Sequence, residues 1–134
     1  MPVYRRGRHS VSALHAHLVF VTKYRRPVLD AMLRVCEHTM REVARGLGAE
    51  LSEFNGEADH VHLLIAYPPT LALSVLVNRL KGVSARELRY QFTGRCNRAR
   101  MRGHFWSPSY FAISCGGAPL TIIKQYIEQQ NRPT

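Results

Sequence analysis

Two histidines and a distant tyrosine are the residues of this chain whose types and spacing best suit chemistry on a phosphodiester. His60 and His62 lie two positions apart in an apolar run over residues 60–67, which is typical of a β-strand. Side chains alternate along a strand, so both imidazoles are expected on one face, with Val61 on the other. Two neutral imidazoles placed side by side can bind one divalent metal ion. We therefore interpret His60 and His62 as candidate metal ligands.

A tyrosine on the last predicted helix is the candidate nucleophile. Pro119 is expected to open that helix, which runs to about Gln130. Tyr126 and Gln130 are four residues apart and therefore share a helix face. A tyrosine oxygen that attacks phosphorus would link the protein to a 5′-phosphate, while the amide of Gln130 would complete the coordination of the metal. The alternative stays open that Tyr126 is a core aromatic, because it also follows Ile122 by four residues.

The donor set indicates which metal the site would take. Two imidazoles and one amide oxygen leave open positions, which suits Mg²⁺ or Mn²⁺ acting on a phosphate, and Mn²⁺ tolerates nitrogen ligands better. Structural zinc is less favoured, because it usually takes four protein ligands and no cysteine is close to the histidines in sequence. His15 and His17 repeat the same spacing without a matching nucleophile, and we expect His17 near the site as support for a ligand.

The composition favours a polyanionic partner. The chain has 134 residues, with 19 Lys and Arg against 9 Asp and Glu and a formal net charge of +10, and its length fits a single domain over residues 1–134. A merely solvated basic surface is the alternative. The candidate nucleic-acid contacts are Lys23, Arg25, Arg26, Arg79, Lys81, Arg86, Arg89, Arg98, Arg100 and Arg102. The candidates for stacking on unpaired bases are Tyr24, Tyr90, Trp106 and Phe105, of which Phe105 is expected in the core.

Cysteine usage and hydropathy indicate the compartment. Cys36, Cys96 and Cys115 are odd in number and lack the spacing of a disulfide framework or a zinc knuckle. A reducing cytoplasm is therefore the expected location. No apolar run approaches the roughly 20 residues that span a bilayer, so no membrane association is expected.

The order of predicted elements indicates an α+β fold. Strands are expected over residues 14–22, 49–55, 60–67 and 105–114, with a hairpin turn over 56–59. One helix is expected over 29–47 and a second after residue 70. The resulting β-α-β-β-α-β order, followed by the terminal helix, is that of a ferredoxin-like antiparallel sheet with helices on one face. The other face would be free to carry a site or a partner.

Local signals refine the second half of the chain. Thr70 is expected to cap the second helix at its start. Ser84 and Glu87 have the spacing of a capping box, which predicts that the helix restarts after Gly82. Residues 95–103 are polar and Arg-rich and are predicted to form a loop.

Four segments of the chain are notable together: HLVFVTKYRRPVL at 17–29, DHVHLL at 59–64, FWSPSYF at 105–111 and YIEQQ at 126–130. With these segments the chain resembles a known family, the single-tyrosine HUH transposases (TnpA type) of the smallest prokaryotic insertion sequences. The segments occur in order over nearly the whole chain, and such an ordered set is far more specific than any one of its parts.

The resemblance implies a set of roles and partners. It implies that His60, His62 and Gln130 bind the divalent metal and that Tyr126 is the nucleophile. It implies a homodimer in which the tyrosine helix of one subunit can complete the histidine site of the other. The implied substrate is single-stranded DNA with subterminal hairpins, which is cut and rejoined at the ends of the element. The Arg-rich stretch 95–102 matches no family pattern, so its role stays open.

Other functions stay open at this point. A domesticated relative acting on chromosomal repeat hairpins would share the chemistry, and matched ends in the flanking DNA would distinguish a mobile element from it. Replication initiators and relaxases also combine histidines with tyrosine, but they are usually longer, and relaxases need a third histidine. A non-catalytic nucleic-acid-binding ferredoxin-like module would form no metal-dependent tyrosine adduct. A structural zinc protein would be identified by metal analysis.

Overall fold

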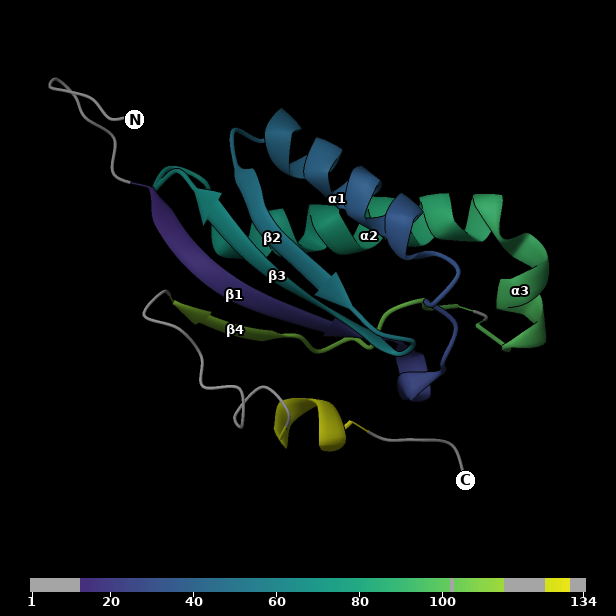
Figure 1. The fold of residues 1–134 in the computed structure, drawn as a ribbon. Helices are drawn as coiled ribbons and strands as arrows, with labels where there is room; N and C mark the ends of the chain where they lie inside the picture. The colour runs from purple at the N-terminus through teal and green to yellow at the C-terminus, as the bar shows by residue number, and fades with distance from the viewer. Residues whose placement is uncertain (1–12, 102, 115–124, 131–134) are drawn as a thin grey trace, which may run out of the picture.

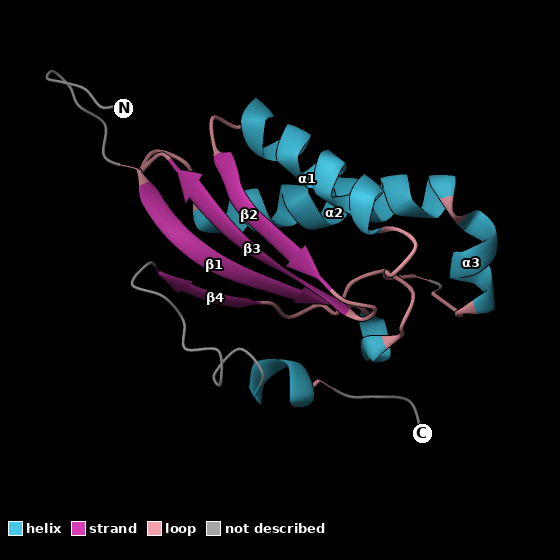
Figure 2. Cartoon of the chain, in the orientation of Figure 1, coloured by secondary structure: helices cyan, strands magenta, loops and turns pink. Residues whose placement is uncertain are grey.

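A computed structural model describes residues 13–101, 103–114 and 125–130 of the chain, as an antiparallel sheet with two long helices on one side (Figures 1 and 2). The strands are β1 (Leu14–Val21), β2 (Glu50–Gly56), β3 (His60–Tyr67) and β4 (Phe111–Ser114). The helices are α1 (Leu33–Gly46), α2 (Leu73–Gln91) and the short α3 (Thr93–Arg98), with a 3-10 turn η1 (Lys23–Arg25) after β1. None of the helices within these ranges is long and apolar enough to cross a membrane.

The topology is the one expected from the sequence. The strand order is β2-β3-β1-β4, and each neighbouring pair is antiparallel. This is the split βαβ arrangement, because β1 and β2 are separated by β3 and joined through α1. Helices α1 and α2 cover one face of the sheet, whereas residues 125–128, which are also helical, lie on the opposite side (Figure 1). The predicted ferredoxin-like fold is confirmed.

Strict alternation along β1 and β3 separates the core from the face that carries the histidines. On β3, Val61, Leu63 and Ile65 are fully buried on the helix side. On β1, Leu18 and Phe20 are equally buried in the same core. The residues between them point to the other face, as the period of two requires.

The second helix is longer and simpler than the sequence predicts. The N-cap residue of α2 is Ala72, so the prediction that Thr70 caps this helix is wrong. The helix also runs without a break through Gly82, so the prediction that a new helix starts at Ser84 is wrong. Ser84 lies fully buried on the core face, where its hydroxyl accepts a hydrogen bond from Trp106 Nε1 at 3.0 Å. Tertiary packing of one helix face therefore outweighs the local capping pattern.

The region after α2 also departs from the prediction. Part of the predicted loop 95–103 belongs to α3. This short helix packs on the main hydrophobic core through the buried side chain of Cys96. The predicted strand 105–114 is shortened to the four residues of β4. Before it, Trp106 makes only an isolated bridge to Thr22, and Pro108 lacks the N–H that a continuous ladder would need. Residues 107–109, called the Ser-Pro-Ser segment below, therefore lie outside the regular strand pairing.

The burial of Cys36 in the core leads to a prediction about the reactivity of its thiol. Cys36 is fully buried on α1, and burial, with a smaller contribution from Glu37, raises its pKa to about 12. The thiolate is the reactive form, so Cys36 should resist alkylation by iodoacetamide at pH 8 in the folded protein and react once urea unfolds it. Mass-spectrometric mapping of the alkylated peptides measures this. Labelling of Cys36 at the unfolded rate in native buffer would contradict its burial.

Candidate active site

The two predicted ligand residues lie side by side on the sheet face opposite α1 and α2. His60 and His62 are both half-buried, and between them Val61 points into the core. In the ladder with β1, His60 is opposite Val21 and His62 is opposite Val19. Directly opposite residues in an antiparallel pair point to the same face. The predicted placement of the histidine pair is therefore confirmed.

His60 is oriented by a buried carboxylate. Its Nδ1 lies 2.9 Å from Oδ1 of Asp59, while Oδ2 of Asp59 accepts a hydrogen bond from Arg25 Nε at 3.1 Å. Burial alone would raise the pKa of Asp59, but the hydrogen bonds with His60 and Arg25 outweigh it, and the pKa is lowered. A carboxylate that binds Nδ1–H fixes the imidazole tautomer and leaves the lone pair of Nε2 for a ligand.

His62 has an imidazole neighbour. Its Nε2 lies 3.0 Å from Nδ1 of His17 on β1, and the two rings stack with centroids 5.2 Å apart. Burial, followed by the proximity of His17, lowers the pKa of His62, which favours the neutral form that binds metals. The expected position of His17 beside the site is confirmed.

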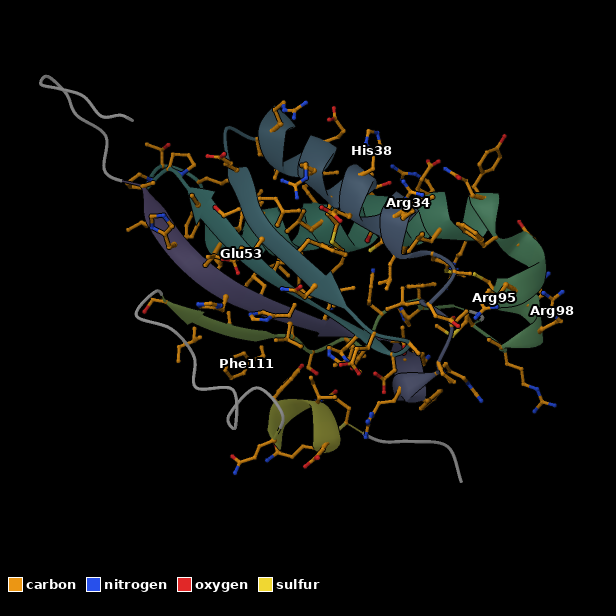
Figure 3. All side chains as sticks on the ribbon, in the orientation of Figure 1. Arg34, His38, Glu53, Arg95, Arg98 and Phe111 are labelled. Carbon is orange, nitrogen blue, oxygen red and sulfur yellow. The ribbon has the colours of Figure 1, made fainter. Side chains whose placement is uncertain are left out.

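The tyrosine packs across the same face of the sheet. Within the tyrosine segment (residues 125–130), Ile127 is buried against Val19 and Val21, the residues opposite the two histidines. The ring of Tyr126 lies against Phe111, which projects from β4 toward this segment (Figure 3), with ring centroids 5.4 Å apart. The rest of the predicted terminal helix, from Pro119, lies outside the described residues.

The Ser-Pro-Ser segment holds both functional side chains of the tyrosine segment. The hydroxyl of Ser109 lies 3.1 Å from the phenol oxygen of Tyr126 and donates to Oε1 of Gln130 at 3.3 Å. Ser107 donates to the same Gln130 oxygen at 3.2 Å. Tyr126 and Gln130 both contact Ser109, which agrees with the prediction that they share one face. Burial raises the pKa of Tyr126, and the hydrogen bond with Ser109 offsets part of that increase, so the phenol is protonated near neutral pH.

The donor chemistry fits a divalent metal only if Gln130 takes part. Within the described part of the chain, no group of three His, Cys, Asp or Glu side chains is placed to hold a metal ion. His60 has a preorganised nitrogen, His62 favours its neutral form, and Gln130 supplies an amide oxygen from the segment that crosses the same face. Two nitrogens and one oxygen with open positions suit a catalytic rather than a structural ion.

The candidate nucleic-acid contacts fall into two groups. Some have a structural partner: Arg25 binds Asp59, Arg89 donates to the Met101 carbonyl at 2.8 Å, and Lys81 donates to the backbone of the Ser-Pro-Ser segment. Others are at least partly exposed, and their side chains have no hydrogen-bond or ion-pair partner in the described ranges: Lys23, Arg26, Arg79, Arg86, Arg98 and Arg100. Arg102 lies outside those ranges. Their role in binding stays a prediction.

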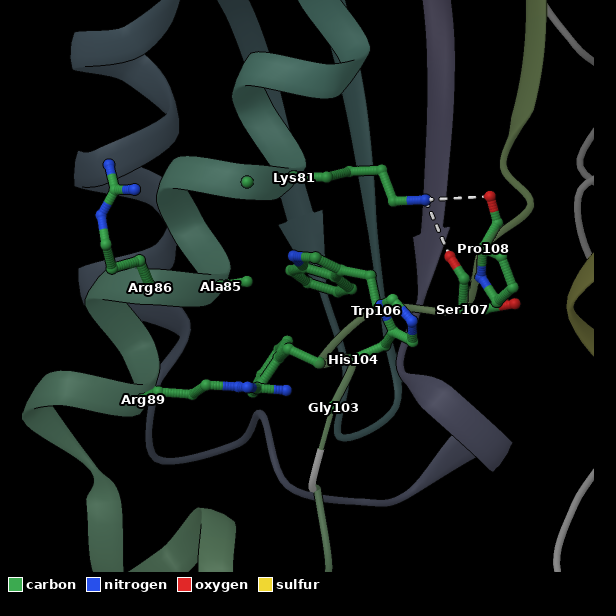
Figure 4. Close-up of a pocket in the computed structure, with 11 residues that line it drawn as sticks. Lys81, Ala85, Arg86, Arg89, Gly103, His104, Trp106, Ser107 and Pro108 are labelled. Atoms are coloured by element: carbon green, nitrogen blue, oxygen red, sulfur yellow. Dashed lines mark hydrogen bonds between the residues drawn. The ribbon is translucent and has the colours of Figure 1, made fainter.

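Two pockets adjoin these basic residues. One, of about 300 Å³, is lined by Lys23, Tyr24 and Gln130 together with the start of the Ser-Pro-Ser segment. The other, of about 480 Å³, lies between α2 and residues 103–108 and has Arg86 and Arg89 on its wall (Figure 4). Of the four aromatic residues considered for stacking, Tyr24 and Tyr90 are exposed, whereas Phe105 and Trp106 are buried.

Several residues of the site escape prediction from the sequence. Asp59 and Arg25 belong to segments that carry the family resemblance, but neither is predicted to orient His60. Ser107 and Ser109 are missed because residues 105–114 read as one strand. The signal for them is Pro108, which interrupts a strand and marks a segment with another purpose.

Comparison with known proteins identifies the class. The chain matches the IS200-like transposase family over residues 10–130. It is 31% identical to the ISDra2 transposase TnpA of Deinococcus radiodurans, over 95% of this chain and 91% of that protein. It is 30% identical to the transposase of insertion sequence IS200 from Salmonella typhimurium, over 85% and 74% of the two chains.

Solved structures agree with the fold. A putative transposase from Deinococcus radiodurans superposes with a TM-score of 0.86 at 33% identity, covering 96% of this chain and 99% of that one. A REP-associated tyrosine transposase bound to a REP hairpin has a TM-score of 0.51 at 16% identity, covering 97% of this chain and 70% of that one, which shows the shared fold alone. The protein is a DNA transposase. It belongs to the IS200-like family, of the single-tyrosine TnpA type.

Proposed function

We propose that this transposase cuts and rejoins single-stranded DNA through a covalent bond between Tyr126 and a 5′-phosphate. The ion assisting the reaction would be Mg²⁺ or Mn²⁺, bound by His60, His62 and Gln130. One observation carries the proposal: the segment with Tyr126 and Gln130 packs on Val19 and Val21, the direct ladder neighbours of the two histidines.

The chemistry is a pair of balanced exchanges. The phenol oxygen of Tyr126 attacks the scissile phosphorus and gives its proton to solvent, while the bond from phosphorus to the 3′-oxygen breaks and that oxygen takes a proton from solvent to leave as a 3′-hydroxyl. In the reverse direction, a 3′-hydroxyl attacks the phosphotyrosine and releases the phenol. The phosphodiester energy is retained in the protein–DNA bond, so rejoining requires no ATP.

The residues of this chain have separate tasks in that exchange. Ser109 holds the phenol oxygen, and Asp59 keeps His60 in one tautomer. When bound, the divalent ion would withdraw charge from the scissile phosphate and so favour attack by a phenol whose pKa is raised by burial.

The DNA substrate is proposed to be a single strand with subterminal hairpins. The pocket beside Gln130 is lined by Lys23 and by Tyr24, a residue that is 48% exposed and whose ring is proposed to stack on a base. The ammonium of Lys23 lies 5.3 Å from the centroid of that ring, so charge and stacking surface adjoin the proposed reaction site. The relative with the solved hairpin complex binds a REP hairpin. The chain is 31% identical to the ISDra2 transposase and 16% identical to the REP-associated transposase, and this difference favours a mobile element over a domesticated relative.

A denaturing gel tests the proposal. The protein is mixed with labelled single strands taken from both flanks of its gene, with Mg²⁺, with Mn²⁺ or with EDTA. An SDS-resistant protein–DNA band that needs the metal and disappears on protease treatment is the expected result. Binding of the strands without such a band would favour a non-catalytic module.

Complementation tests the proposed homodimer. Two variants, Tyr126→Phe and His62→Ala, should each be inactive alone, because one lacks the nucleophile and the other a metal ligand. If the tyrosine of one subunit serves the histidines of the other, a mixed dimer retains one intact site. A mixed dimer would then have one intact active site where a wild-type dimer has two, so co-expressed variants should recover up to about half of the wild-type cleavage activity. No recovery in a dimer shown to be mixed would place each tyrosine with its own histidines.

A further inference from the structure

We propose that Lys81 is a positioning residue, whose ammonium fixes the Ser-Pro-Ser segment so that its serines hold Tyr126 and Gln130 for cleavage. The inference rests on the proposed function of those two residues and assigns the part that holds them. Lys81 itself touches neither side chain of the tyrosine segment among the contacts of the described residues.

The ammonium of Lys81 is committed to three consecutive backbone carbonyls. Lys81 Nζ donates to the oxygen of Ser107 at 2.7 Å, of Pro108 at 3.3 Å and of Ser109 at 3.4 Å. The first two of these contacts are drawn as dashed lines from Lys81, in the middle of α2, in Figure 4. An ammonium has three donors and no acceptor, so it matches three carbonyls that point to one place. All three carbonyls of the Ser-Pro-Ser segment therefore face this ammonium.

Aromatic side chains complete the environment of the cation. Lys81 Nζ lies 5.9 Å from the ring centroid of Phe20, in the core of β1, and 5.8 Å from that of Tyr110. Cation–π contacts at these distances favour a charged ammonium in a half-buried place. Lys81 thus connects α2, the strand beside the histidines and the Ser-Pro-Ser segment.

The same segment faces the active site with its hydroxyls. The backbone of Ser107 and Ser109 accepts from Lys81, while their side chains contact Gln130 and the phenol of Tyr126. No regular strand pairing fixes residues 107–109, although the backbone N–H of Ser107 donates to the Val21 carbonyl at 2.7 Å. Loss of the ammonium would leave the carbonyls of Pro108 and Ser109 without the cation that orders them, and both serines would lose their fixed direction.

A direct contact between Lys81 and DNA phosphate is the competing role, and the two roles predict different measurements. A phosphate contact would change DNA affinity and its salt dependence. A positioning role would change the rate of cleavage at saturating DNA, because small displacements of reacting groups cost up to about 100-fold in rate.

The test compares Lys81→Met with Arg45→Met. Methionine keeps the aliphatic stem of Lys81 and removes the charge. Arg45 is an exposed residue of α1, paired only with Glu42 among the described side chains, so its variant removes one positive charge elsewhere. We expect both variants to bind single-stranded DNA alike and unfold with similar Tm, whereas Lys81→Met alone lowers single-turnover cleavage by at least about tenfold.

A double-mutant cycle and an NMR signal sharpen the test. In a Ser107→Ala, Ser109→Ala background, Lys81→Met should cause less than about a twofold further loss, because the residues act in one chain of contacts. In protein labelled with ¹³C-tyrosine, Lys81→Met should shift the ring signal of Tyr126, which is identified by its absence in Tyr126→Phe. This signal does not depend on activity.

The outcomes separate the two proposals. An unmoved Tyr126 signal in Lys81→Met would overturn the positioning role, even if wild type formed no DNA adduct and the proposed function had failed. Weaker DNA binding with normal cleavage at saturation would overturn it in favour of a phosphate contact. If Lys81→Met does not fold, Lys81→Gln, which keeps a donor, is measured against Ser109→Ala, and both must move the Tyr126 signal for the inference to hold.

Discussion

Replacing Tyr126 by phenylalanine should abolish DNA cleavage while leaving DNA binding intact. The variant loses one oxygen, and with it both the nucleophile and the 3.1 Å contact with Ser109. The ring contact with Phe111 and the packing of Ile127 on the sheet persist. We expect the cleavage rate to fall by on the order of 10⁴-fold or more, because the group proposed to form the covalent intermediate is removed. Loss of the Ser109 hydrogen bond should cost about 1 kcal/mol of folding stability at most.

The measurement is single-turnover cleavage beside an equilibrium binding assay on the same labelled strand. Tyr67→Phe is the matched control, because Tyr67 ends β3 at the opposite end from His60 and its hydroxyl has no hydrogen-bond partner in the ranges described. The control should cleave at the wild-type rate. Cleavage by Tyr126→Phe at that rate would move the nucleophile to another residue and remove the basis of the proposed mechanism.

The first three strands and the histidine face could be predicted because their cause is local. Alternation of apolar residues on β3 requires Val61 and Leu63 to enter the core, and this leaves His60 and His62 on the other face whatever the rest of the chain does. The family resemblance adds Tyr126 and Gln130, whose contacts with Ser109 agree with a common site.

The remaining parts depend on tertiary contacts that no local pattern records. Ser84 has the spacing of a helix cap, but the indole of Trp106, 22 residues away, makes it a core residue. Residues 95–103 read as a polar loop, yet α3 forms where Cys96 packs and where Arg95 donates to the Val28 carbonyl at 2.9 Å. From the sequence, Lys81 is predicted to contact DNA phosphate, whereas in the fold its ammonium donates to three backbone carbonyls.

His62→Ala should abolish cleavage by removing metal affinity. His62 is one of the three proposed metal donors, and alanine leaves the core side of β3 unchanged because Val61 and Leu63 carry the packing. A change in the groups that merely support a ligand typically costs about 10–100-fold in metal affinity, so loss of a ligand should exceed about 100-fold. A Mn²⁺ titration monitored by calorimetry or electron paramagnetic resonance measures the affinity directly. Cleavage is measured at the same Mn²⁺ concentrations.

The control for this prediction is His15→Ala. His15 belongs to the other histidine pair of the sequence, and it is exposed on β1. Its loss should change neither Mn²⁺ affinity nor the cleavage rate. High Mn²⁺ should restore part of the activity of His62→Ala, because mass action offsets weaker binding. Wild-type cleavage by His62→Ala at low Mg²⁺ would show that the histidine pair does not bind the catalytic ion, and the role of the imidazole face would then have to be found in DNA binding.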